Sequence, residues 1–177
     1  MTRLRVIVLT MVAGLLFIGA VGCTPRQTVS PPAPVTPGGE PPVDFGFVVR
    51  WGVMGKNQLD TWSGEFQKDL ILAGTATTQL RLTPEEMRDV YREMERIEVF
   101  TYPTAFNPPS SMGVTPYQSY YLKVAAGGKT NEIYWDDRGL STAPPAAALR
   151  SLIQRVQQMV QDRPEYRHMP APQGGYE

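Results

Sequence analysis

The hydrophobic period of the chain changes at Thr83. From Phe45 up to this point, apolar and polar residues alternate, and directly beyond it apolar residues recur at every third or fourth position. A period of two is typical of β-strands with one buried face, and a period near 3.6 is typical of amphipathic helices. The two periods occur in separate segments of the chain. This favours an α+β layer fold, in which helices cover one face of an antiparallel sheet.

Three strands are expected before Thr83. They are predicted over residues 45–53, 61–67 and 78–82, with a turn over 55–58 between the first two. The tryptophans of the chain fall on the apolar side of their predicted strands, so we expect them to lie in the core. These tryptophans are Trp51, Trp62 and Trp135.

A helix is expected to begin directly after Thr83. Thr83 and Glu86 have the spacing of a capping box, and Pro84 suits the first helical position. One face carries an apolar stripe made of Met87, Val90, Tyr91, Met94 and Ile97. The opposite face carries three charge pairs at i, i+3, which are Glu85–Arg88, Asp89–Arg92 and Glu93–Arg96.

The second half of the chain repeats this order. Alternation over 119–124 and at Ile133 and Trp135 predicts a hairpin, with Gly127-Gly128 supplying its tight turn. Apolar residues over 149–160 then predict a second helix. The order βββαββα predicts an antiparallel sheet of about five strands with two helices packed on one face, all within a single domain over 45–177.

The N-terminus has the pattern of a bacterial lipoprotein signal. Two arginines precede an apolar run over residues 6–22, which ends in Ala20-Val21-Gly22-Cys23. We therefore expect residues 1–22 to be a signal peptide and Cys23 to carry the lipid. The alternative is that residues 6–22 form one transmembrane helix, because about 17 apolar residues is the lower limit for spanning a bilayer.

Residues 23–44 are predicted to be the lipidated cysteine and a tether. The tether is rich in proline, contains Gly38-Gly39 and has little apolar surface to bury, so an extended conformation is favoured. The sequence therefore predicts an extracytoplasmic domain that is held at the outer face of a membrane by the lipid on Cys23.

Composition argues against several classes of site. Cys23 is the only cysteine and His168 the only histidine, so zinc, haem and histidine-dependent nucleophiles are not expected. We predict no metal site, no cofactor and no catalytic residue. The chain has 17 basic and 17 acidic residues, and this balance gives no indication of a nucleic-acid partner.

Carboxylates near strands leave an enzymatic alternative open. A pair of them could act as general acid and base on a cell-wall glycan, and Asp136-Asp137 could bind calcium. The simpler interpretation is that Asp60 and Asp136 end strands and accept hydrogen bonds from turn amides. The acids concerned are Asp60, Glu65, Asp69, Asp136 and Asp137.

Aromatic residues supply the leading hypothesis, which is a binding face. Helices on one face of the sheet leave the other face open, and exposed tyrosines there could stack on sugars or peptide. The expected partner is a cell-wall component or an envelope protein. The candidate residues are Tyr117, Tyr121, Tyr134, Arg50 and Lys123.

Several stretches of the sequence also carry a resemblance to a family. They are RWGVMGKNQLDTWSGEFQKDL, TTQLRLTPEEM, TPYQSYYLKV, IYWDD and PEYRHMPAPQGGYE. Together they resemble a family of small, uncharacterised lipoproteins from Gram-positive bacteria of the Bacillus type. The resemblance covers most of residues 45–177 and implies a place on the outer face of the cytoplasmic membrane. It implies no activity, cofactor or catalytic residue.

Overall fold

The computed structural model describes residues 39–110 and 113–177. The predicted signal peptide over 1–22, Cys23 and most of the predicted tether lie outside the described residues. All the named helices and strands belong to one unit of the chain.

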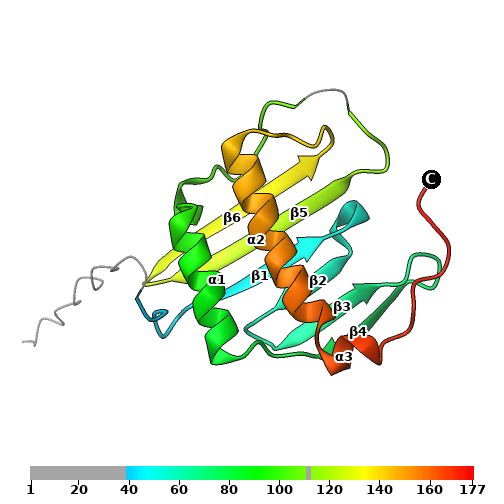
Figure 1. Ribbon diagram of the computed structural model, residues 1–177, viewed down its shortest axis with the longest axis horizontal. Helices are drawn as coiled ribbons and strands as arrows, with labels where there is room; N and C mark the ends of the chain where they lie inside the picture. The colour runs from blue at the N-terminus through cyan, green and yellow to red at the C-terminus, as the bar shows by residue number, and fades with distance from the viewer. Residues whose placement is uncertain (1–38, 111–112) are drawn as a thin grey trace, which may run out of the picture. The chain divides into compact units, whose positions relative to one another are not determined.

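An antiparallel sheet of six strands, in the order β4-β3-β2-β1-β5-β6, forms the framework. Its central strands are β2 and β1, and its edges are β4 and β6 (Figure 1). The strands are β1 (Gly46–Trp51), β2 (Asn57–Asp60), β3 (Glu65–Asp69), β4 (Thr75–Gln79), β5 (Gln118–Ala126) and β6 (Lys129–Asp137).

The α+β class is confirmed, but the expectation of about five strands is wrong. The predicted strand over 61–67 is in fact the turn between β2 and β3 followed by the start of β3. Asp60 makes this turn, because its carboxylate accepts hydrogen bonds from the amides of Trp62 and Ser63. The predicted turn over 55–58 is displaced towards the N-terminus, where a 3-10 turn, η1 (Val53–Gly55), precedes β2.

Trp62 is therefore not a core residue. Its side chain lies on the β2–β3 turn and is 45% exposed, whereas Trp51 and Trp135 are buried as predicted. The Trp62 indole lies against the backbone of Gly46, where a Cβ would come within 2.3 Å of the indole nitrogen. Gly46 thus leaves the space that the turn tryptophan occupies.

Two helices, α1 (Pro84–Arg96) and α2 (Pro144–Gln161), lie across the same face of the sheet (Figure 1). The capping box of α1 is confirmed, with Thr83 accepting from the Glu86 amide and Glu86 accepting from the Thr83 amide. Two short helical turns, η2 (Val99–Thr101) and α3 (Pro164–Arg167), follow α1 and α2.

The core lies between the helices and the sheet. The predicted apolar stripe of α1 faces it, with Val90, Tyr91 and Met94 buried. Of the three expected charge pairs on α1, Glu93–Arg96 forms, but Arg88 and Asp89 pair with residues outside the helix. Their partners are Glu40 and Arg155, respectively.

Both ends of the described chain are fixed to this framework. Asp44 accepts hydrogen bonds of 2.8 and 2.7 Å from the amides of Gly127 and Gly128, which form the predicted β5–β6 turn with φ of 58° and 73°. These amide bonds lower the pKa of Asp44. At the other end, the C-terminal tail pairs with Ile71 through Gln173.

No helix within residues 39–110 and 113–177 has both the length and the apolar character that crossing a membrane requires.

Candidate functional site

The side of the sheet that α1 and α2 leave uncovered is the candidate site, and we call it the open face. Residues on this face are set by strand register: Arg50 of β1 lies opposite Gln58 of β2 and Tyr121 of β5. Tyr121 in turn lies opposite Tyr134 of β6. Alternation within each strand directs these side chains away from the core.

Tyr121 and Tyr134 form the centre of the site. Their ring centroids lie 4.8 Å apart with an interplanar angle of 45°. The Arg50 guanidinium lies 5.2 Å from the centroid of the Tyr121 ring, which is within the range of a cation–π contact. Tyr134 remains 52% exposed, so its ring offers apolar surface beside a cation.

A charged pair borders the tyrosines. The Lys123 ammonium lies 3.0 Å from the Glu132 carboxylate, and these residues are cross-strand neighbours. The Tyr134 hydroxyl also donates to Glu132, at 3.4 Å. We call Arg50, Tyr121, Lys123, Glu132 and Tyr134 the tyrosine cluster.

Two pKa shifts follow from these contacts. Burial, the Glu132 charge and Tyr134 together raise the pKa of the Tyr121 phenol to about 12. The hydrogen bond from Lys123 lowers the pKa of Glu132, although burial opposes this shift. Both groups therefore keep a fixed charge state at neutral pH, with Tyr121 protonated and Glu132 ionised.

Four of the five predicted binding residues thus lie together, and Tyr117 lies apart. Tyr117 precedes β5, and the Arg138 guanidinium lies 4.8 Å from its ring centroid. Its neighbourhood is a separate pocket of about 240 Å³. The pocket is lined by Val53, Met54, Thr115, Pro116, Tyr117, Tyr176 and Glu177.

The sequence analysis did not identify two members of the site, Glu132 and Gln58. Glu132 alternates in phase with Tyr134 in β6, so its face could have been predicted. Gln58 could not, because the predicted turn over 55–58 covered it.

Four of the five carboxylates considered for catalysis, all of them except Glu65, are engaged in local contacts. Asp60 caps the β2–β3 turn, and Asp69 accepts from the Ile71 amide and the Tyr176 hydroxyl. Asp136 accepts from the Ser119 hydroxyl and pairs with Arg138. For Asp60, this confirms the turn-capping interpretation.

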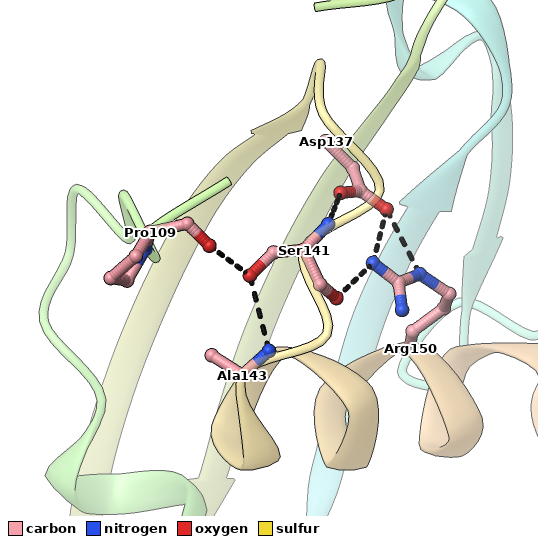
Figure 2. Close-up of polar contacts among 5 residues, drawn as sticks. All are labelled: Pro109, Asp137, Ser141, Ala143 and Arg150. Carbon is pink, nitrogen blue, oxygen red and sulfur yellow. Dashed lines mark hydrogen bonds and ion pairs between the residues drawn. The ribbon is translucent and has the colours of Figure 1, made fainter. Parts of the chain in front are cut away.

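Asp137 belongs to a buried polar cluster at the end of β6 (Figure 2). Its carboxylate accepts from Arg150 Nε and Nη2, at 2.9 and 2.6 Å, and from the Ser141 amide. The Ser141 hydroxyl donates to the Pro109 carbonyl and accepts from the Ala143 amide. The cluster ties the start of α2 to the sheet and to the loop before β5.

Asp136 and Asp137 do not form a shared cation site. Successive strand residues point to opposite sides, so Asp136 is exposed and Asp137 is 1% exposed beneath α2. Over residues 39–110 and 113–177, no group of three or more metal-binding side chains comes together. A pocket of about 300 Å³ lies beside the two acids and is bordered by Asn107, Ser110 and Trp135.

These features place the protein in the class of α+β domains, with one sheet face covered by helices and the other face open. Compared with models of protein families and with curated proteins, the chain matches none of them.

Proposed function

We propose that the chain is a lipid-anchored, non-catalytic interaction domain that binds a component of the cell envelope through the tyrosine cluster. The observation that carries this proposal is the Tyr121–Tyr134 pair on the open face, in which Tyr121 is half-buried, Tyr134 is exposed and Arg50 lies over the Tyr121 ring. Tyrosine and arginine are, with tryptophan, enriched at the energetic centres of interfaces, because each combines a large contact area with polar bonding.

The position of the cluster supports binding rather than folding. Core tyrosines of this domain, such as Tyr91 and Tyr120, are buried, whereas Tyr134 keeps about half of its surface exposed. The Tyr134 ring is exposed on β6, which is paired with β5 along its whole length, so a ligand that covers the ring would order few further side chains.

The location in this proposal comes from the N-terminal sequence. The small residues before Cys23 predict cleavage and lipidation, and the prolines beyond predict a spacer between the membrane and the domain. The resemblance to Gram-positive lipoproteins is consistent with the same location.

A hydrolase gains no comparable support. Glycoside hydrolysis needs two carboxyl groups that flank one bond across a cleft. Among the acids considered, Asp60, Asp136 and Asp137 are held by a turn, an exposed ion pair and a buried ion pair.

The test uses residues 39–177, which contain every described helix and strand and the whole described core. This domain is mixed with isolated envelope fragments of the producing bacterium and sedimented. We expect the wild-type domain to sediment with the envelope and the Tyr134→Ala variant to remain in solution.

Leu140→Ala is the matched control, because Leu140 is also a large exposed side chain but lies outside the tyrosine cluster. It should sediment like the wild type. Equal sedimentation of the wild-type and Tyr134→Ala domains would refute the open face as the binding surface.

A further inference from the structure

One residue from each strand of the sheet lies in a single lateral row on the open face. The row is defined by consecutive register partners, which are Thr77, Gln67, Gln58, Arg50, Tyr121 and Tyr134. With neighbouring strands about 4.8 Å apart, the row spans about 24 Å. It crosses all six strands at right angles to their direction.

Arg50 is the charged residue of the row and lies near its middle. Lys123 and Arg138 on the same face have carboxylate partners. Within the part of the chain that the structure describes, Arg50 has no acid within ion-pair distance, and its Nε donates to Gln58 Oε1 at 2.7 Å. This bond orients the guanidinium, and its two terminal nitrogens can bind one carboxylate through two parallel hydrogen bonds.

The two ends of the row differ in chemistry. Tyr121 and Tyr134 offer aromatic surface at one end. At the other end, Thr77 offers a hydroxyl, and Gln67 offers its amide oxygen because its amide nitrogen donates to the Lys56 carbonyl. Groups that both donate and accept hydrogen bonds suit a ligand that carries many hydroxyls.

We propose that this row binds a linear polysaccharide whose sugar rings carry carboxylates. A sugar ring would lie against Tyr134 and Tyr121, a ring carboxylate would pair with Arg50, and hydroxyls would bond to Gln67 and Thr77. Arg50, Tyr121 and Tyr134 line none of the pockets described above, and a continuous row across six strands suits an extended polymer. The inference rests on the proposed function, since both use the open face.

The test measures binding of residues 39–177 to the uronic-acid polymers polygalacturonate, alginate and hyaluronate by titration calorimetry. We expect at least one to bind, and Arg50→Gln and Tyr134→Ala each to weaken that binding about tenfold or more. Methyl esterification of polygalacturonate removes the carboxylates and keeps the rings, so the esterified polymer should not bind.

Arg155→Gln is the control for charge. Arg155 is an exposed arginine on α2, away from the open face, and it should leave binding unchanged. Equal loss in Arg50→Gln and Arg155→Gln would show non-specific attraction and would overturn the proposal. Thermal unfolding of each variant confirms that it is folded.

The remaining outcomes separate this inference from the proposed function. Failure of all three polymers, with envelope sedimentation still lost in Tyr134→Ala, would overturn the polysaccharide and leave the interaction domain standing. Binding of poly-glutamate in preference to the polymers would overturn it in favour of an acidic peptide. If the wild-type domain binds none of the three polymers and does not sediment with the envelope, both proposals are overturned.

Discussion

Asp136 and Asp137 are neighbours in the chain, but their carboxylates have opposite environments. Asp137 is buried against Arg150, whose side chain is 19% exposed, whereas Asp136 and Arg138 form an exposed pair. Removing one charge from a buried pair leaves the other uncompensated, so Asp137→Asn should lower the free energy of unfolding by about 3–5 kcal/mol. Asp136→Asn should cost less than about 1 kcal/mol. Urea denaturation measures both, and equal losses would contradict the role assigned to the buried cluster.

Tyr121 provides a prediction for alkaline pH. The folded phenol keeps its proton up to a pKa of about 12, above the ordinary value of 10.0. Its contribution to stability is therefore complete below pH 10 and is lost as the pH rises from about 10 to 12. Tyr121→Phe cannot ionise, so its stability should fall less steeply over this range. Tyrosinate absorbance during an alkaline titration should also lose one late-ionising group, and an unchanged titration curve would refute the shift.

The N-terminus of α1 is capped by a side chain, and the N-terminus of α2 is not. Its Thr83 hydroxyl accepts from the Glu86 amide, whereas Ala143 before α2 has no side-chain cap. Thr83→Ala should therefore lower the free energy of unfolding by about 1 kcal/mol. Ser151→Ala, at an exposed position within α2, is the control and should stay within about 0.5 kcal/mol. Thermal unfolding of both variants checks this, and no difference between them would mean that packing alone fixes the start of α1.

The elements that could be predicted are those with short-range causes. The capping box at Thr83 and the turn at Gly127-Gly128 act within a few residues, and both were confirmed. The division of β2 from β3 was missed because Trp62 and Phe66 suggested one apolar face. The Asp60 carboxylate instead turns the chain between them and leaves Trp62 exposed.

For the molecule as a whole, alternation predicted which residues share the open face but not which of them touch. Arg50 and Tyr121 are far apart in the sequence, and only the pairing of β1 with β5 places them together. Tyr117 has the same phase as Tyr121, yet Arg138 and the loop before β5 place it elsewhere. Strand register depends on pairing between distant segments, so the row across six strands could not be predicted from the local sequence pattern.

The N-terminal sequence is compatible with two kinds of membrane anchor, and a labelling experiment distinguishes them. Lipidation would attach two or three acyl chains at Cys23, enough for stable anchoring, while the alternative is a transmembrane helix over residues 6–22. Cells that express the full chain are fed a palmitate analogue that can be detected after protein purification. We expect the wild type to be labelled, Cys23→Ser to lose the label, and the control Thr24→Ser to keep it. An unlabelled wild type that still sediments with membranes would instead indicate a transmembrane anchor.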